Sequence, residues 1–133
     1  AGRHQFLTFT TATPLQWAVA EALALPAGWH AAHRARYGAA RARLVEGLNS
    51  AGFAVLPASG TWFVTIDLAA SGLPADDVTV AERLIREARV ASIPVSAFYA
   101  EAPERGYLRL CFAKEDATLD EALERLARFR AGA

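Results

Sequence analysis

The stretch Tyr107-Leu108-Arg109-Leu110-Cys111-Phe112 decides the fold, because apolar residues alternate in it with residues of mixed character. Side chains of a strand point alternately to its two faces, so this pattern predicts a strand with one face on a core. The residues expected to pack on helices are Leu108, Leu110 and Phe112. Arg109 is expected on the opposite face, together with Tyr107 and Cys111.

Arg109 carries a positive charge in the middle of this apolar strand. Placing a guanidinium there is costly unless it meets a carboxylate. The carboxylate can belong to the protein, with Asp67 or Glu101 as candidates, or to a bound substrate. Planar, bidentate geometry suits arginine to either role, so the residues alone leave both open.

Outward from this strand, the sequence predicts elements in the order helix, helix, strand, strand, helix, strand, strand, helix. The predicted ranges are a helix from 13 to about 25, a helix over 29–49, strands over 53–56 and 61–68 joined by a hairpin loop, a helix after Asp76, an edge strand over 90–95, the strand over 107–112 and a last helix from Thr118. This order favours an α/β fold of the two-layer α+β kind, in which helices pack on a small, mainly antiparallel sheet.

Several helix ends carry recognisable signals. Thr13-Pro14-Leu15-Gln16 and Thr118-Leu119-Asp120-Glu121 both match the capping box that opens a helix. Gly52 is placed to end the second helix in the left-handed conformation. Asp76 and Asp77 are both expected to cap the third helix. The apolar face expected on that helix consists of Val80, Leu84, Ile85 and Ala88.

The composition narrows the class of protein. Hydrophobic residues make up 53% and charged residues 21% of the 133 residues, which fits one globular domain. The net charge is zero and no apolar run approaches the roughly 20 residues of a membrane span, so we expect neither nucleic acid nor a membrane as partner. A single cysteine and the lack of a signal-peptide pattern favour a cytoplasmic location. Because the chain has no methionine, we expect it to be a piece of a longer protein.

Five motifs, taken in order along the chain, resemble a single family. They are His4-Gln5-Phe6-Leu7-Thr8-Phe9, Thr13-Pro14-Leu15-Gln16, Gly60-Thr61-Trp62-Phe63, Ile93-Pro94-Val95-Ser96-Ala97-Phe98-Tyr99 and Leu108-Arg109-Leu110-Cys111-Phe112-Ala113-Lys114. The series is similar to the class I/II aminotransferases, and most similar to the kynurenine- and methionine-type branch of the fold-type I pyridoxal phosphate enzymes. It covers nearly the whole chain.

The resemblance implies roles for particular residues. Arg109 matches the strand arginine that, in this family, pairs with the α-carboxylate of the amino-acid or 2-oxo-acid substrate. The segment from Gly60 to Phe63 would lie near the same pocket, with Trp62 in place of the family's tyrosine. Phe98 would belong to the mobile edge of that pocket. The resemblance thus implies a substrate-binding site and no catalytic residue in this chain.

The resemblance also implies an organisation. Residues 1–133 would be the C-terminal, small domain of the enzyme, with residues 1–26 as the trailing part of the large domain and an interface helix. Phe9 and Thr10 would reach the substrate pocket across the interface of a homodimer. The cofactor, pyridoxal 5′-phosphate, would be held by a lysine and phosphate ligands upstream of Ala1. The chain alone is therefore expected to bind neither cofactor nor metal.

The remaining reactive side chains are expected to be structural. Lys114, the only lysine, is expected to be a solvated charge, because a nucleophilic amine needs a desolvated pocket. His30 and His33 can share a helix face but lack a third metal ligand. Cys111 is expected to be a buried, inert thiol.

Two functions remain open on these grounds. In the first, the chain is part of an enzyme that transfers an amino group between an amino acid and a 2-oxo acid. In the alternative, it is a non-catalytic, stand-alone or decayed aminotransferase-derived interaction domain.

Overall fold

The computed structural model describes residues 10–100 and 106–132 of the chain. It forms two compact units, Ala1–Ala35 and Arg36–Ala133. Helix α3 (Ala27–Ser50) contributes its first turns to the first unit and the rest to the second. Among the described residues, no helix combines the length and the apolar character needed to cross a membrane.

The first unit contains helix α2 (Thr13–Leu23), which starts one residue before Pro14. The predicted capping role of Thr13 is wrong, because Thr13 is already helical and the N-cap position is Ala12, without a side-chain cap. Proline in the first turn costs nothing, since its missing N–H has no helical partner there. No residue of α2 is buried, and its large apolar side chains Leu15, Trp17, Val19 and Leu23 are all exposed.

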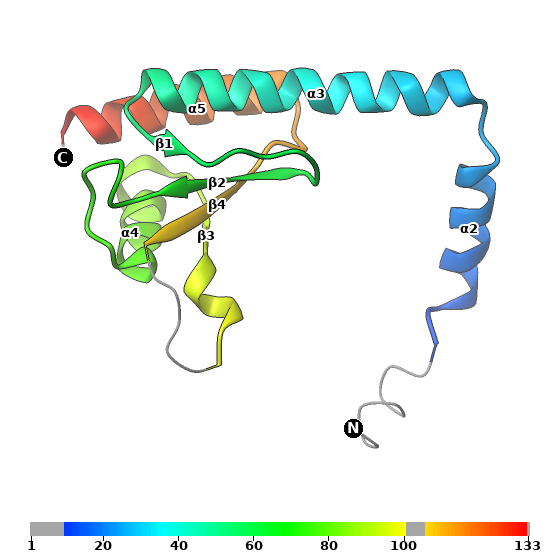
Figure 1. The fold of residues 1–133 in the computed structure, drawn as a ribbon, viewed down its shortest axis with the longest axis horizontal. Helices are drawn as coiled ribbons and strands as arrows, with labels where there is room; N and C mark the ends of the chain where they lie inside the picture. Colours follow the sequence, from blue (N-terminus) through cyan, green and yellow to red (C-terminus); the bar gives the residue numbers. More distant parts are fainter. Residues whose placement is uncertain (1–9, 101–105, 133) are drawn as a thin grey trace. The chain divides into compact units, whose positions relative to one another are not determined.

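The second unit is built on a four-stranded sheet with the order β1-β2-β4-β3 (Figure 1). The strands are β1 (Ala54–Val55), β2 (Phe63–Asp67), β3 (Ile93–Pro94) and β4 (Tyr107–Cys111), and every neighbouring pair is antiparallel. The predicted antiparallel sheet and the predicted order of elements are confirmed. The strand predicted over 90–95 lies at the sheet edge, as expected, and Pro94 leaves it only two residues long.

Helices α3, α4 (Asp77–Arg83) and α5 (Asp116–Ala131) complete this unit, with the π-helical turn η1 (Leu84–Ala88) directly after α4 and the 3₁₀ turn η2 (Val95–Phe98) after β3. Figure 1 shows α3 and α5 running along the same side of the strands. They close a two-layer α+β arrangement over one core. The large side chains with under 2% exposure in this core are Phe112, Leu48, Ile66, Leu68, Leu84, Leu108, Leu126, Val64 and Val80.

The alternation predicted for the strand at residues 107–112 is confirmed. Leu108, Leu110 and Phe112 are at most 5% exposed, whereas Arg109 is half-buried on the other face. Burying each such apolar side chain contributes about 1.5–3 kcal/mol. This energy fixes which face of β4 meets the helices, and so it also fixes the face on which Arg109 lies.

Some predicted boundaries differ from the structure. Helix α5 begins at Asp116 with Glu115 as its N-cap, so Thr118 lies within the helix and does not cap it. Acidic residues favour this earlier start because they interact well with the positive end of the helix. Ile85 is 50% exposed and does not belong to the buried face of its helix. Gly52 has φ +82°, which confirms the predicted left-handed end of α3.

Candidate functional site

Arg109 lies in the middle of β4, which is paired on both sides, with β2 and with β3. Its register partners are Thr65 on β2 and Ile93 on β3. Hydrogen bonding to two neighbours holds the backbone at this position, so the side chain starts from a fixed base. The residues directly opposite one another in an antiparallel pair share a face, so Thr65 and Ile93 border Arg109 on the side away from the core.

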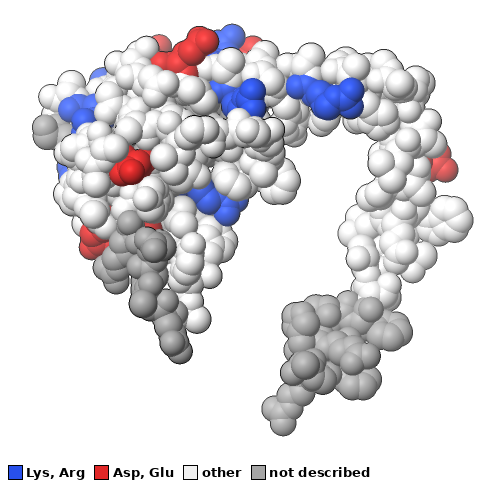
Figure 2. All heavy atoms as spheres, viewed as in Figure 1, with Lys and Arg blue, Asp and Glu red and all other residues white. Residues whose placement is uncertain are grey.

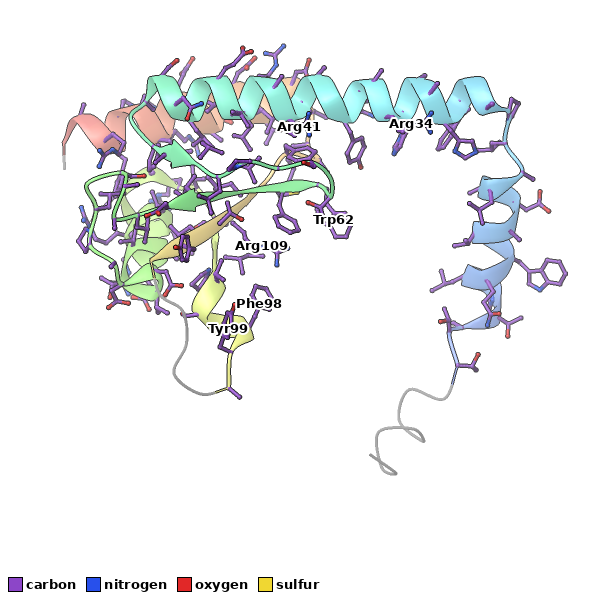
Figure 3. All side chains as sticks on the ribbon, in the orientation of Figure 1. Arg34, Arg41, Trp62, Phe98, Tyr99 and Arg109 are labelled. Atoms are coloured by element: carbon purple, nitrogen blue, oxygen red, sulfur yellow. The ribbon has the colours of Figure 1, made fainter. Side chains whose placement is uncertain are left out.

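Two aromatic rings lie close to the Arg109 guanidinium. Its Cζ atom lies 3.6 Å from the ring centroid of Phe63 and 5.0 Å from that of Phe98. Phe63 comes from β2, and Phe98 is the last residue of η2. A cation near the face of an aromatic ring is stabilised by the negative potential of that face. In Figure 3 the labelled side chains of Trp62, Phe98 and Arg109 lie on the side of the ribbon away from α3 and α5.

Arg109 has no anionic partner among the described residues. No ion pair or hydrogen bond joins it to a carboxylate there, and its Nε atom is buried without a hydrogen-bond partner. The candidate Asp67 instead accepts a hydrogen bond from the backbone N–H of Ala70, at 2.9 Å from Oδ1. The other candidate, Glu101, lies outside the described residues. The rings stabilise the cation without neutralising it, so the guanidinium keeps its charge and donor groups for an anion.

The segment between β1 and β2 is held by hydrogen bonds to α3 and to the end of β4. Arg41 on α3 donates from Nη1 to the carbonyl of Ala58 at 2.6 Å, which ties this segment to the helix. The N–H of Phe112 donates to the carbonyl of Trp62 at 2.9 Å, which places Trp62 beside the end of β4. The Trp62 side chain is 57% exposed, and its ring meets that of Phe63 edge-on, with centroids 6.3 Å apart.

Gly60 is exposed, and a Cβ atom added there would meet no atom within 4 Å. Thr61, and not Gly60, adopts a positive φ of 66° in this segment. Neither space nor backbone conformation within the described residues therefore requires glycine at position 60.

Thr10 belongs to the first unit, where its Oγ1 accepts a hydrogen bond of 3.4 Å from Gln16 Nε2. It borders a shallow hollow along α2 with Leu15 and Val19. Phe9 lies outside the described residues. The part of both residues in a substrate pocket stays a prediction.

The other reactive residues differ in part from expectation. Cys111 is exposed, so its predicted burial is wrong: it follows Arg109 on the open face, at the end of the strand. Lys114 is exposed, as predicted. His30 and His33 flank the ring of Trp29 at 5.2 and 5.1 Å between centroids. Within residues 10–100 and 106–132, no group of three or more His, Cys, Asp or Glu side chains is arranged to hold a metal.

The charged side chains of the described residues form no continuous patch of one sign on the face that Figure 2 shows. On the face shown in Figure 2, the basic side chains lie in separate patches with uncharged surface between them. Several of them are paired with acidic side chains, as in the contacts of Arg43 with Asp116 and Asp120. A nucleic-acid interface needs a continuous basic surface, which this face lacks.

Phe63 was predicted only as the last residue of the segment 60–63 near the pocket and not as a residue that contacts Arg109, although its ring is the nearer of the two that do. The signal was available in the alternation of β2, which places Phe63 and Thr65 on the face opposite to Val64 and Ile66. Asp77 was predicted only as a helix cap. Its side chain is instead buried and accepts two hydrogen bonds from Ser96. The local sequence does not predict this contact, because the two residues are 19 positions apart.

The chain is similar to a known protein family and to several known proteins. Residues 2–126 match the family model for aminotransferase class I and II. Methionine aminotransferase of Escherichia coli (strain K12) is 40% identical over 123 residues, covering 92% of this chain and 32% of the relative. A probable N-succinyldiaminopimelate aminotransferase of Mycobacterium tuberculosis is 37% identical over 132 residues, with 92% of this chain and 33% of the relative covered.

Solved structures give the same result. N-succinyldiaminopimelate aminotransferase from Mycobacterium tuberculosis superposes with a TM-score of 0.80 at 39% identity, over 93% of this chain and 32% of that one. The Escherichia coli protein with methionine aminotransferase function reaches 0.76 at 39% identity, over 94% and 33%. The chain thus spans about a third of the length of the relatives that it matches. With the family model matching nearly its whole length, the chain belongs to the class I and II aminotransferases.

Proposed function

We propose that this chain is the small domain of a pyridoxal phosphate-dependent aminotransferase and that Arg109 binds the α-carboxylate of its substrate. The observation that carries the proposal is a half-buried guanidinium in contact with two aromatic rings, without a carboxylate partner among the described residues. The substrates of this reaction are an amino acid and a 2-oxo acid, and both carry the carboxylate that Arg109 would bind.

The geometry suits this task. The sheet fixes the backbone of Arg109 on both sides, and the ring of Phe63 supports one face of its guanidinium. A planar guanidinium held in this way presents its N–H groups in one direction, where a carboxylate can accept two parallel hydrogen bonds. Fixing the carboxylate also fixes the α-carbon next to it. Such positioning lowers the entropic part of the barrier to the chemical step.

The other residues of the proposed pocket come from different segments of the enzyme. Trp62 and Phe98 offer apolar surface to the substrate side chain, and Gly60 belongs to the segment that carries Trp62. Phe9 and Thr10 would join the pocket from the second subunit of a homodimer. The names of the relatives, methionine aminotransferase and N-succinyldiaminopimelate aminotransferase, support an amino acid as substrate without selecting one.

Pyridoxal phosphate is the cofactor of this family, and the described residues of this chain do not fit it. The sole lysine, Lys114, is exposed in the segment after β4, whereas a lysine that acts as a nucleophile needs a desolvated site. We therefore assign cofactor binding and the covalent chemistry to the large domain, of which residues 1–26 would be the trailing part. The separate compact unit at the start of the chain supports this division. It extends to Ala35 because it includes the first turns of α3. We place the complete enzyme in the cytoplasm.

The test is the Arg109→Lys substitution in the complete enzyme. Lysine keeps the charge but loses the second hydrogen bond and the stacking on Phe63, so we expect KM for the amino acid to rise by about 10- to 100-fold. The matched control is Arg128→Lys, at an exposed arginine in the last turn of α5. Unchanged kinetics in the Arg109 variant would remove this residue from the proposed role.

A further inference from the structure

We propose that Asp77 is a positioning residue for the Arg109 site, because its carboxylate fixes the turn that holds Phe98 next to the guanidinium. The part of this inference that concerns substrate rests on the proposed function. Its structural part concerns only contacts within the second unit. Asp77 touches neither Arg109 nor Phe98 in a hydrogen bond, so it acts through Ser96.

The contact between Asp77 and Ser96 uses both carboxylate oxygens. The backbone N–H of Ser96 donates to Oδ2 at 2.8 Å, and its hydroxyl donates to Oδ1 at 2.7 Å. Asp77 is 0% exposed and Ser96 is 8% exposed, so water competes little for these bonds. Hydrogen bonds to a charged acceptor are about twice as strong as neutral ones. One side chain of α4 therefore grips one residue of η2 at two points.

A buried carboxylate is costly unless hydrogen bonds or a cation compensate it. In the described part of the chain no ion pair reaches Asp77, so the two bonds from Ser96 carry that compensation. Ordinary helix capping does not explain this arrangement. Asp76, the neighbouring acid, already caps α4 by accepting from the N–H of Thr79. Asp77 therefore links α4 to η2 through its hydrogen bonds with Ser96.

Phe98 needs this connection because the core does not hold it. Its side chain is 60% exposed, so its place depends on the backbone of the short turn Val95–Phe98. Ser96 lies within that turn, and its carbonyl accepts the N–H of Tyr99 at 3.1 Å. Fixing Ser96 at its N–H, its hydroxyl and its carbonyl therefore fixes the direction in which Phe98 leaves the turn.

The consequence reaches Arg109 through the ring of Phe98, 5.0 Å from Cζ. Together with the ring of Phe63, which also contacts the guanidinium, the ring of Phe98 restricts the rotamers open to Arg109. An arginine that is already ordered loses less conformational entropy when an anion binds. Releasing η2 would leave Arg109 and its charge in place but would make it a poorer binder. The proposal therefore predicts a graded loss, and not the full loss expected for Arg109→Lys.

The first test reads the site directly in the 133-residue chain. We expect the two rings to shift the ¹H–¹⁵N signal of the Arg109 Nε–H upfield, and Ser96→Ala or Asp77→Ala should move it downfield. Asp77→Asn should restore it, since the amide oxygen accepts the N–H of Ser96 and the amide nitrogen donates to its hydroxyl. Asp76→Ala is the matched control: it removes the helix cap on Thr79 at a cost of about 1 kcal/mol and neither of the two bonds between Asp77 and Ser96. Ser96→Ala retains one of the two bonds, so it serves if Asp77→Ala does not fold. A signal unmoved in Ser96→Ala and Asp77→Ala, or moved equally in Asp76→Ala, overturns the inference.

The second test measures kinetics in the complete enzyme. Ser96→Ala and Asp77→Ala should raise KM for the amino acid by about 2- to 10-fold, the range that corresponds to ordering one flexible side chain on binding. Asp77→Asn should restore KM, and Asp76→Ala should leave it as in the wild type. If Arg109→Lys leaves KM unchanged while the Nε–H signal responds as predicted, the carboxylate role fails and the structural part of the inference stands. If KM responds to Arg109→Lys but to neither Ser96→Ala nor Asp77→Ala, the role of Asp77 in substrate binding is refuted and the proposed function stands.

Discussion

The contact between Arg109 and the ring of Phe63 can be measured as a coupling free energy in a double-mutant cycle. The variants are Phe63→Leu, Arg109→Met and the pair of them. Leucine keeps an apolar side chain on the strand, and methionine keeps much of the aliphatic length of arginine without its charge. The cycle subtracts the cost of each single change and leaves the interaction between the two side chains.

The expected size follows from the geometry. A cation–π contact contributes about 0.5–1 kcal/mol at an exposed site and about 2 kcal/mol when desolvated. Arg109 is half-buried, and its Cζ lies 3.6 Å from the ring centroid of Phe63. We therefore expect a coupling of about 1 kcal/mol, read from urea unfolding followed by circular dichroism.

A second cycle provides the comparison. Phe98 lies at 5.0 Å and is 60% exposed, so the cycle of Phe98→Leu with Arg109→Met should give about half the coupling or less. A coupling below about 0.3 kcal/mol for Phe63 would be indistinguishable from additivity and would refute the contact as a stabilising one. Equal coupling free energies for both rings would show that distance and burial do not determine the relative strengths of the two contacts.

Two further predictions concern the helices. A Cβ at Gly47 would lie 2.5 Å from Leu123 Cδ1, whereas one at Gly38 on the same helix would meet nothing within 4 Å. Gly47→Ala should therefore be less stable to urea than Gly38→Ala by about 1–3 kcal/mol, and equal stabilities would contradict the close approach of α3 to α5. On α4 and η1, the hydrogen bond from Arg83 holds the pKa of Glu87 below its ordinary value of 4.5, so the contribution of this pair to stability is present above that pH and is lost as the pH falls through the lowered pKa. A carboxyl NMR titration of Glu87 should show its midpoint rising in Arg83→Gln, and a midpoint that does not move would sink the assignment.

Much of the fold could be predicted from the sequence because its signals are local. The alternation around Arg109 predicted both the strand and its buried face, and the apolar spacing of α3 predicted the helix that covers it. Capping boxes were less informative. Thr13 and Thr118 both lie inside their helices, since neighbouring proline and acidic residues favour earlier starts. Local pattern thus located the elements better than their ends.

The candidate site divides in the same way. Arg109 could be singled out because a charge between leucines is visible in the sequence, and its side chain does lie on the open face. The exposure of Cys111 could not be predicted. Alternation indicates the face on which a side chain lies, but not how much other residues cover that face near the end of the strand. The proposed place of Trp62 and Phe98 in the pocket came from family resemblance and not from a local pattern.

By itself, the sequence determined which segments become helices and strands, which face of β4 is buried, and that Arg109 lies on the other face. These follow from periodicity, which depends on neighbours a few residues apart. Only the tertiary structure decided what surrounds Arg109: the ring of Phe63 from a paired strand, the ring of Phe98 from a separate turn, and the grip of Asp77 on Ser96 across 19 residues. These contacts join segments distant in the chain, and they form because burying the common core of sheet and helices brings those segments together.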